Sequence, residues 1–402
     1  MKDPGVNVGV KVEVRRHRRV AARRRGAAGL ILWSLLLMSN AAAALNEQCD
    51  SWPAWTRFKQ LYLSQDGRII DASSPQQVTV SEGQAYALFF ALIGNDPQTF
   101  KTVLEWTTNN LAQGDLTRSL PAWRWGRDDD GTWHVLDSNA AADADLLIAY
   151  TLGEAGRLWS EASYATLGRA LASRILREEV ASIPGLGATL LPGPRGFVDE
   201  QVWRLNASYV PLQVVRGISR QTDDQSWREI ARSSERLILA SAPRGFAADW
   251  IEYRSAKGFA TDRATGGVGS YNAIRVYLWA GMLAESDRAR AKLARHLAPM
   301  VDNAARRSKP AERVDTNTLV MTGNGSPGFS AALLPMLRNA KLRDAVQVHR
   351  TRVQTESLKS NEAYYSDALS LFGLGWLEDR YRFGSSGLLT VSWTQACKPA
   401  SS

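Results

Sequence analysis

The sequence is poor in cysteine and histidine, the usual ligands of zinc, and lacks the motifs that bind nucleotides. Its 402 residues include only two cysteines and four histidines. The histidines (His17, His134, His296 and His349) are widely scattered, so no zinc-ligand spacing is present. A P-loop and a dinucleotide-binding fingerprint are also lacking. These absences argue against a zinc site and give no sign of a nucleotide-binding enzyme.

Excess positive charge is scarce once the N-terminal segment is set aside. The chain carries a net charge of +9, from 49 Lys and Arg against 40 Asp and Glu. Residues 1–45 hold nine of the basic residues and two of the acids, a net +7, which leaves +2 for the remainder. The basic balance therefore belongs to this segment, and binding of nucleic acid by the body of the protein is not indicated.

The N-terminal segment has the layout of a secretory signal. An arginine-rich region precedes an apolar run at 30–38 and the small residues Ala41–Ala44. This pattern predicts a signal peptide over residues 1–44, with an approximate cleavage site, and a periplasmic or secreted protein. The uncharged stretch Gly26–Leu45, about 20 residues, could instead remain as a membrane anchor, so membrane contact is expected only through this leader. Residues 45–402 are predicted to form a single domain.

The two cysteines, Cys49 and Cys397, bracket the mature chain. In an oxidising compartment they can form a disulfide that ties the two ends together. The alternative is a pair of buried free thiols. The leader favours the disulfide.

Apolar sequence, by contrast, is abundant and makes up 45% of the chain. Three stretches, at 82–94, 142–154 and 271–284, join a polar start to an almost unbroken apolar run. Such runs predict buried helices, and Ser81 is predicted to be the N-cap of the first. The polar groups at the three starts are Glu82, Asp143, and Tyr271 with Asn272. If the helices pack in parallel, these groups converge at one end of one core.

Apolar periodicity predicts about twelve helices along the chain. The expected bounds are 53–63, 82–94, 98–112, 142–154, 160–178, 208–218, 224–240, 271–284, 286–303, 329–337, 341–354 and 362–374. Very apolar helices tend to alternate with amphipathic ones, which suggests inner and outer rings of an α/α barrel. A globin-like fold or a solenoid is the alternative, although no repeat of fixed period is present. Trp123 and Trp125 are predicted to form a hairpin-like edge with residues 133–136.

The chain has fourteen tryptophans, a high count. Ordinary core packing is one explanation, whereas tryptophans clustered with acids suggest stacking platforms for sugar rings. Glycoside hydrolysis needs two carboxyl groups that face each other: a protonated one to release the leaving sugar, and an ionised one to activate water or attack. A helix N-terminus would lower the pKa of Glu82, whereas burial and a neighbour such as Asp143 would raise it. The proposed chemistry therefore requires the two acids to be close together.

These motifs resemble glycoside hydrolase family 8. Ser-Glu-Gly-Gln-Ala-Tyr at 81–86 is similar to the acid motif of that family, and 142–150 is similar to its signature, with Ala142 where Ser or Thr is usual. Further matches lie at 136–139, 154–159, 184–187, 203–206, 208–209, 248–250, 271–277 and 363–365. The resemblance covers residues 50–397 and is nearest to the periplasmic endoglucanases of bacterial cellulose synthase operons.

The resemblance implies an all-α fold, an (α/α)6 barrel with inner and outer helix rings and long loops over an open cleft. It implies an endo-1,4-β-glucanase (cellulase) that hydrolyses internal β-1,4-glucosidic bonds with inversion and without a metal or other cofactor. The implied role is in bacterial cellulose biosynthesis. The implied partners are a β-1,4-glucan (cellulose) chain and the cellulose synthase complex, and the protein is expected to be a monomer.

The resemblance also implies roles for single residues. Glu82 matches the proton donor, and Asp143 matches the signature acid, which under inversion would hold the distorted sugar and tune Glu82. Asp145 lies two positions on, about 200° around a helix, so it is predicted to point elsewhere as a structural acid. Substrate contacts are expected from Trp123, Trp125, Asn139, Tyr209, Tyr271 and Arg275.

One position departs from the family pattern. The usual general base is an Asp where this chain has Asn272, and an amide has no useful basicity. Asp262, in the preceding loop, is the first candidate for a substitute base, and Asp249 is the second. The alternative function is a catalytically weakened or inactive glucan-binding accessory protein of a cellulose export system. A third alternative is an enzyme for chitosan or xylan.

Overall fold

Helices dominate the computed structural model, which describes residues 51–361 and 363–394. In these residues the helices are α2 (Pro53–Tyr62), α3 (Ser81–Ile93), α4 (Pro97–Leu111), α5 (Ala142–Leu158), α6 (Ala162–Glu178), α7 (Leu212–Thr222), α8 (Ser226–Ser241), α9 (Ala273–Gly281), α10 (Arg290–His296), α11 (Ala298–Ala305), α12 (Pro327–Asn339), α13 (Arg343–Glu356) and α14 (Tyr364–Leu377), with the short 3-10 helices η1 (Ala207–Tyr209) and η2 (Ser392–Thr394). All of them belong to one compact unit, Asp50–Ser402.

Each helix predicted from the apolar periodicity is present, and one of them is divided. The predicted helix at 286–303 is two helices in the structure, α10 and α11, which meet at Leu297. Pro299 lies in the first turn of α11. Because proline has no N–H to donate to the preceding turn, the helix ends and restarts at this point.

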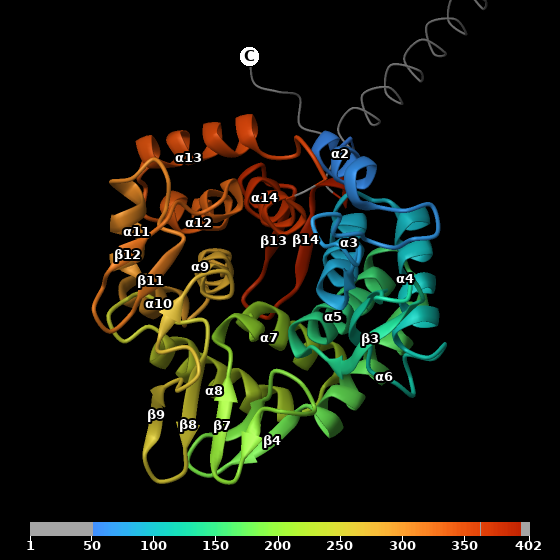
Figure 1. Cartoon of the computed structure of the whole chain (residues 1–402), viewed down its shortest axis with the longest axis horizontal. Coiled ribbons are helices and arrows are strands. Elements are labelled where there is room, and N and C mark those ends of the chain that lie inside the picture. The colour runs from blue at the N-terminus through green and yellow to red at the C-terminus, as the bar shows by residue number, and fades with distance from the viewer. Residues whose placement is uncertain (1–50, 362, 395–402) are drawn as a thin grey trace, which may run out of the picture. The chain divides into compact units, whose positions relative to one another are not determined.

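Six helices contact one another in sequence around a centre. Helix α3 packs on α5, α5 on α7, α7 on α9, α9 on α12, α12 on α14, and α14 on α3 again. Figure 1 shows these helices around the middle of the view, with the C-terminal β-hairpin among them. The contacts therefore close on themselves.

A second set of helices covers the outside of the first. Helices α4, α6, α8, α10 and α13 pack on α3, α5, α7, α9 and α12 respectively, and α2 packs on α14. The covering helices are amphipathic, whereas α3 buries all of its residues except Glu82. This difference matches the alternation of apolar and amphipathic helices in the sequence.

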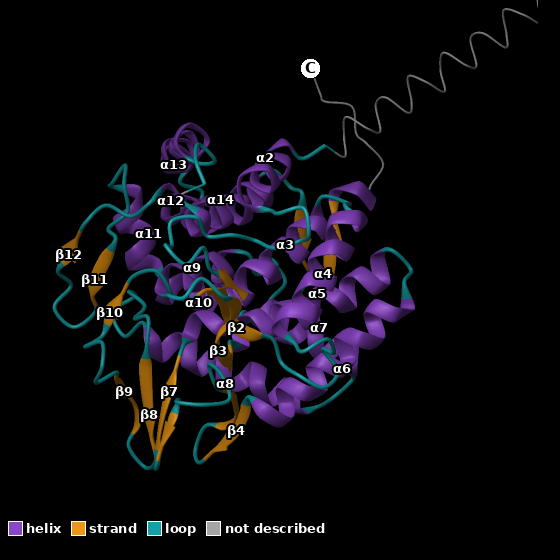
Figure 2. Cartoon of the chain, turned by 45° about the vertical axis from the view of Figure 1, so that its right-hand side comes forward, coloured by secondary structure: helices purple, strands orange, loops and turns teal. Residues whose placement is uncertain are grey.

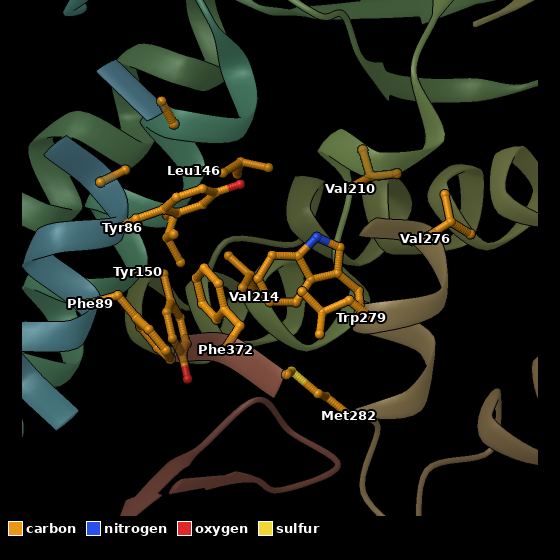
Figure 3. Packing of buried hydrophobic residues seen from close by; sticks show 14 of the residues in the cluster. Tyr86, Phe89, Leu146, Tyr150, Val210, Val214, Val276, Trp279, Met282 and Phe372 are labelled. Carbon is orange, nitrogen blue, oxygen red and sulfur yellow. The ribbon is translucent and has the colours of Figure 1, made fainter. Parts of the chain in front are cut away.

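The apolar side chains of the inner helices fill the space between them. Figure 3 shows Phe372 of α14 among aromatic side chains from α3 and α9. Its ring centroid lies 4.9 Å from that of Tyr86, 5.4 Å from that of Phe89 and 5.1 Å from that of Trp279. Aromatic pairs at these separations contribute beyond the area they bury, so the core fixes how the inner helices lie.

The strands form small antiparallel sheets outside this core. They are β1 (Thr79–Val80), β2 (Ala122–Arg127), β3 (Trp133–Ala140), β4 (Val180–Ile183), β5 (Gly187–Leu190), β6 (Val198–Asp199), β7 (Val202–Leu205), β8 (Ile251–Arg254), β9 (Gly258–Thr261), β10 (Val268–Gly269), β11 (Arg313–Asp315), β12 (Met321–Thr322), β13 (Tyr381–Phe383) and β14 (Leu389–Val391). The sheet orders are β1-β2-β3, β4-β5, β6-β7-β8-β9, β10-β11-β12 and β13-β14. Figure 2 shows sheet β6–β9 and strands β10–β12 beside the helices.

These strands correct the all-α expectation for the loops, although the core is helical. Only one hairpin was predicted, and it is present: β2 pairs with β3, and Trp125 lies opposite Val135. The other strands are two to four residues long. Segments this short carry too little period-two alternation to be recognised in a sequence.

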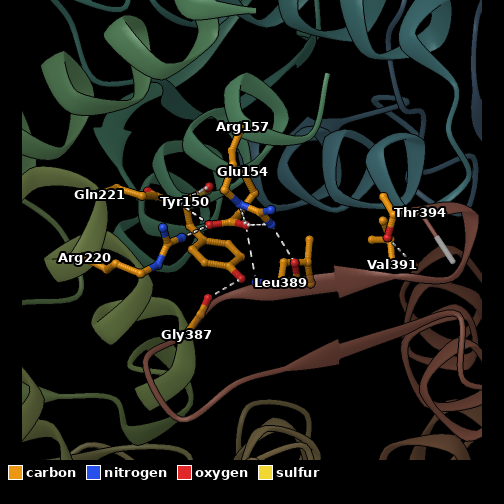
Figure 4. A network of polar contacts seen from close by, with 9 residues as sticks. All are labelled: Tyr150, Glu154, Arg157, Arg220, Gln221, Gly387, Leu389, Val391 and Thr394. Carbon is orange, nitrogen blue, oxygen red and sulfur yellow. Dashed lines mark hydrogen bonds and ion pairs between the residues drawn. The ribbon is translucent and has the colours of Figure 1, made fainter. Parts of the chain in front are cut away.

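A buried carboxylate joins the C-terminal hairpin to the helices. Glu154 of α5 has no exposed surface and is ion-paired with Arg157 and Arg220 (Figure 4). Arg157 also donates to the carbonyl oxygen of Leu389 in β14, at 2.6 Å. The network therefore holds the hairpin against α5 and α7.

We expect Glu154→Gln to lower the free energy of unfolding by about 3 kcal/mol. This is the low end for a broken buried ion pair, since Arg157 and Arg220 keep 37% and 31% of their side chains exposed and can be partly hydrated. Urea unfolding measures the change. As a control, Glu105→Gln removes the exposed ion pair with Lys101 and should cost less than about 1 kcal/mol. Equal losses in the two variants would contradict the interpretation.

Cys49 and Cys397 lie outside the described residues, so their disulfide stays a prediction. The described residues nearest to them meet at Arg380. Its guanidinium donates to the carbonyl oxygen of Ser51 at 2.8 Å, and its carbonyl oxygen accepts from the amide of Ser392 at 2.8 Å. The two ends of the described chain are therefore close together, as the disulfide requires.

We expect exported protein to contain the Cys49–Cys397 disulfide, which should stabilise it by roughly 2–5 kcal/mol because it closes a very long loop. Mass spectrometry of peptides from unreduced protein tests the bond directly. Alkylation of both thiols without prior reduction would rule it out.

The predicted leader, residues 1–44, also lies outside the described residues. Among the helices that the structure does describe, none has the length and apolar character needed to cross a membrane.

Candidate active site

The three polar helix starts converge on one arginine. Arg275, in the first turn of α9, donates through Nη1 to the carboxylates of Glu82 on α3 and Asp143 on α5, the latter at 2.8 Å. The same nitrogen lies 3.1 Å from the hydroxyl of Tyr86, and Nη2 lies 2.8 Å from Oδ1 of Asn272. The parallel packing expected of these helices is thus confirmed. Arg275 was expected to bind substrate, but its side chain is only 3% exposed and is occupied by the carboxylates.

Strand pairing decides where the helix that carries Glu82 begins. Val80 is paired with Arg124 of β2 and is extended, so it occupies the N-cap position, and the helix starts at Ser81. The prediction of Ser81 as N-cap is therefore wrong by one residue. The hydroxyl of Ser81 is buried and has no hydrogen-bond partner among the described residues. Glu82 consequently lies in the first turn, with its carboxyl group toward Asp143 and Arg275.

An aspartate from another loop caps the start of α9. Oδ1 of Asp249 accepts hydrogen bonds from the backbone amides of Ser270, Asn272 and Ala273, at 2.8, 3.0 and 2.7 Å. These amides lie at the helix N-terminus and would otherwise lack partners. Oδ2 of Asp249 makes no hydrogen bond to any described residue. Asp249 thus holds Asn272 in place and keeps one free acceptor oxygen.

Burial gives Glu82 the properties of an acid that is protonated near neutral pH. The pKa of Glu82 is raised to about 7, chiefly by loss of hydration. Arg275 lowers it, whereas the neighbouring charge of Asp143 raises it again. A carboxyl group that titrates near the working pH suits a general acid.

The side chain of Asn272 has a fixed orientation. A guanidinium can only donate, so the atom of Asn272 that faces Nη2 of Arg275 must be the carbonyl oxygen. The amide nitrogen therefore points away and presents donors. An aspartate in the same position would offer a free oxygen on that side, which this chain lacks.

Asp262, the first candidate for a substitute base, has no free oxygen. Oδ1 accepts from Arg204 at 2.9 Å, and Oδ2 accepts from the amide and hydroxyl of Thr265 at 2.9 and 2.7 Å. Burial would raise the pKa of Asp262, but these hydrogen bonds hold it below its usual value. A carboxylate so well satisfied is a poor base, so the structure favours Asp249 over Asp262.

Aromatic rings lie beside the carboxylates. The guanidinium of Arg275 lies 5.4 Å from the ring of Tyr209 and 6.0 Å from that of Tyr365. Tyr209 neighbours Trp250, which stacks on Phe197 with 5.9 Å between centroids. The expected contact residue Tyr209 is thus beside the acids, whereas the stacked pair was not predicted.

The β2–β3 hairpin carries a second aromatic group. Trp125 stacks on Trp133 at 5.2 Å, and the guanidinium of Arg68 lies 4.6 Å from each of the two rings. Trp133 is 42% exposed, so an aromatic surface is open to solvent. Trp125 was expected to contact substrate. Trp133 was expected only as part of the hairpin.

Of the remaining predicted contact residues, Trp123 and Asn139 lie on strands β2 and β3, and Tyr271 lies just before α9. Oδ1 of Asp137 accepts from the backbone amide of Asn139 at 2.9 Å, and the side-chain amide of Asn139 donates to the carbonyl oxygen of Arg195 at 2.9 Å. Tyr271 is 48% exposed, and its hydroxyl lies 3.1 Å from Oε1 of Glu312. The side chains of Asn139 and Tyr271 are thus each held by one hydrogen bond.

Asp145 points away from the site, as predicted. It is fully buried and faces Glu179 at the end of α6. No sequence pattern predicts this pair, because the two acids are 34 positions apart and nothing local couples them. Glu154 was also missed, although a charge within an apolar helix was a usable signal.

The chain is similar to known proteins over most of its length. The family model described as glycosyl hydrolases family 8 matches residues 29–379. An endoglucanase of Escherichia coli O157:H7 is 44% identical, over 92% of this chain and 97% of its own length. An endoglucanase of Xanthomonas axonopodis pv. citri is 46% identical, over 93% of this chain and 98% of its own length.

The solved structures agree with this result. The crystal structure of an endo-1,4-D-glucanase from Vibrio fischeri ES114 is 44% identical and superposes with a TM-score of 0.80, covering 86% of this chain and all of its own. An endo-β-1,4-glucanase from Acetobacter xylinum is 25% identical, with a TM-score of 0.65, over 80% of this chain and 96% of its own. The chain therefore belongs to glycosyl hydrolases family 8.

Proposed function

We propose that this protein is an endo-1,4-β-glucanase that hydrolyses internal bonds of cellulose with inversion. The observation that carries the proposal is the contact of Glu82, an acid with only 19% of its side chain exposed and a pKa of about 7, with Asp143 and Arg275. Relatives that are 44–46% identical over nearly their full length are named endoglucanases. A carboxyl group that is protonated near neutral pH is what release of the leaving sugar needs in glycoside hydrolysis.

We also propose that the fold is an (α/α)6 barrel with its substrate cleft at the end where the helix starts converge. The closed series of contacts from α3 through α14 and back supports this arrangement. Glu82, Asp143 and Asn272 lie at the starts of inner helices. The segments between the inner helices at that end, among them β2 with Trp125 and η1 with Tyr209, carry aromatic side chains suited to stacking on glucose rings.

In the proposed reaction, Glu82 donates its proton to the glycosidic oxygen as the bond from that oxygen to the anomeric carbon breaks. A water molecule attacks the opposite face of the anomeric carbon and gives a proton to a carboxylate base. Attack from this face inverts the configuration of the anomeric carbon. Asp143 is assigned to hold the distorted sugar and to keep Glu82 protonated. Arg275 is assigned to orient both carboxyl groups.

For the base we propose Asp249. Its Oδ2 makes no hydrogen bond to the described residues, and burial raises the pKa of Asp249 above its usual value. A carboxylate with a raised pKa is a stronger base. Asp249 also binds the backbone of Asn272, so it lies beside the position that the family normally uses.

The cellular role is proposed from the resemblance to periplasmic enzymes of cellulose synthase operons. We propose a periplasmic or secreted monomer that trims nascent glucan and meets the cellulose synthase complex at its substrate. The alternative is a glucan-binding accessory protein with little activity, and it is favoured by one observation: Asn272 stands at the usual base position.

A reducing-sugar assay on carboxymethylcellulose, xylan and chitosan tests the function. Release of sugar ends from carboxymethylcellulose alone is the expected result. Binding of the polymer without release would establish the accessory role instead. Preference for xylan or chitosan would change the proposed substrate but would leave the proposed reaction, hydrolysis of a glycosidic bond, in place.

The pKa of Glu82 also predicts the alkaline side of the pH profile. A general acid works only in its protonated form, so turnover should fall about tenfold per pH unit above about pH 7. Initial rates on a soluble cellulose between about pH 5 and pH 10 measure the decline. Turnover that stays constant to pH 9 would contradict Glu82 as the acid.

A further inference from the structure

Two buried carboxyl groups lie behind Asp143 and take no part in the proposed reaction. Asp145 is in the first turn of α5, and Glu179 follows the last residue of α6. Both are 0% exposed. The four oxygens of the two groups receive no hydrogen bond from any donor among the described residues. The two side chains instead lie within hydrogen-bonding range of each other.

Two ionised carboxylates cannot satisfy each other, because each can only accept. At least one proton must lie between them. The charged groups that act on the pair most strongly are Asp143 on α5 and Glu178 on α6, both acidic, so nearby charge also favours protonation. Burial, the largest cause, raises the pKa of Asp145 and of Glu179 well above their usual values.

A short path of backbone hydrogen bonds leads from Glu179 to Asp143. The carbonyl oxygen of Glu179 accepts from the amide of Leu191 at 2.7 Å. The next residue, Pro192, accepts through its carbonyl oxygen from the amide of Ala142 at 3.0 Å. Ala142 directly precedes Asp143. The end of α6 is therefore joined to the start of α5 twice, by this backbone path and by the two carboxyl groups.

We propose that Asp145 and Glu179 form a proton-sharing pair that positions Asp143 against Arg275. Neither is a catalytic residue, because they act through the first turn of α5. When the pair loses its proton, two buried negative charges repel each other. The start of α5 then shifts relative to α6, and Asp143 loses its place. Proton sharing by Asp145 and Glu179 does not depend on what the protein binds, whereas the effect of the pair on glucan binding rests on the function proposed above.

Infrared spectroscopy can detect the shared proton. Protein with Glu82→Gln serves as the parent, since it removes the other carboxyl group expected to be protonated near pH 7. We expect a protonated-carboxyl carbonyl band at pH 7 in this parent. The band should be lost when Asp145→Asn and Glu179→Gln are added together, and it should persist with Glu178→Gln, a matched control whose side chain is 37% exposed and paired with Arg174.

Absence of the band in the parent would overturn the proposal, as would its persistence in the variant with both amides. If that variant does not fold, Asp145→Asn and Glu179→Gln are measured singly. Each keeps a donor and an acceptor in the pair, and each should weaken the band. An unchanged band in both single variants would also refute the assignment.

The positioning role is measured by binding of cellopentaose to the same Glu82→Gln proteins. Acids with raised pKa values stabilise the fold at low pH and lose that contribution as pH rises through the folded pKa. We therefore expect the Kd to rise at least about tenfold between about pH 6 and pH 9.5 in the parent, and the melting temperature to fall in parallel. The variant with both Asp145→Asn and Glu179→Gln should show less than about a twofold change in Kd over this range.

Equal pH dependence of Kd in the parent and in the variant with both substitutions would overturn the positioning role. If the parent bound no cellopentaose at any pH, the proposed glucanase function would fail. The infrared band and the pH dependence of the melting temperature would then still decide whether the proton is shared.

Discussion

Replacing Glu82 by glutamine is expected to lower turnover of soluble cellulose at least about a hundredfold, because general acid catalysis typically contributes 10²–10⁴. The amide keeps the size of the side chain and can still accept from Arg275, so binding of glucan should stay nearly unchanged. Turnover is measured by release of reducing ends, and binding by calorimetry with cellopentaose.

Asp71→Asn is the matched control for that variant. Asp71 is a partly exposed acid near the start of α3, and its carboxylate accepts only from Ser73 among the described residues. Its replacement should leave turnover within about twofold, because it touches none of the acids in the site. Near-parental turnover in the Glu82→Gln variant, with folding intact, would remove Glu82 as the proton donor.

The second large effect is expected at the missing base. Asp249→Asn should lower turnover at least about a hundredfold, since an amide cannot take the proton of the attacking water. It can still accept from the α9 amides through its oxygen, so the helix start should survive. In contrast, Asn272→Asp should raise turnover of the parent, because it restores a carboxylate at the usual position of the base.

Asp262→Asn separates the two candidates for the base. Its carboxylate is held by Arg204 and Thr265, so the change should weaken the loop without abolishing turnover. Loss of all activity with Asp262→Asn, while Asp249→Asn stays active, would reverse our assignment. If the parent is inert and Asn272→Asp rescues it, the accessory role is correct and this chain lacks a working base.

Much of the scaffold could be read from local sequence. The apolar runs at 82–94 and 142–154 predicted buried helices, because a helix that is apolar on every side is stable only inside a core. The bounds were correct to within a few residues at most ends. The chief error, at 286–303, came from a proline at the start of α11, which allowed two short helices in place of one.

The chemistry of single side chains was less accessible from sequence. Whether Asp249 or Asp262 has a free oxygen depends on donors that are distant in the chain. Asn272 lies 23 positions from the aspartate that holds its amide, and Arg204 lies 58 positions from Asp262. No local pattern encodes these partners, so only the tertiary contacts decide which of the two acids keeps a free oxygen.

The sequence by itself determined which stretches are buried helices and that Glu82, Asp143 and Asn272 stand at their starts. Helix burial follows from residue composition over one or two turns, which is local information. The tertiary structure alone decided that Arg275 joins the acids, that burial brings the pKa of Glu82 to about 7, and that Asp145 meets Glu179. Each of these depends on desolvation and on partners from other helices, and both arise only when the inner helices pack together.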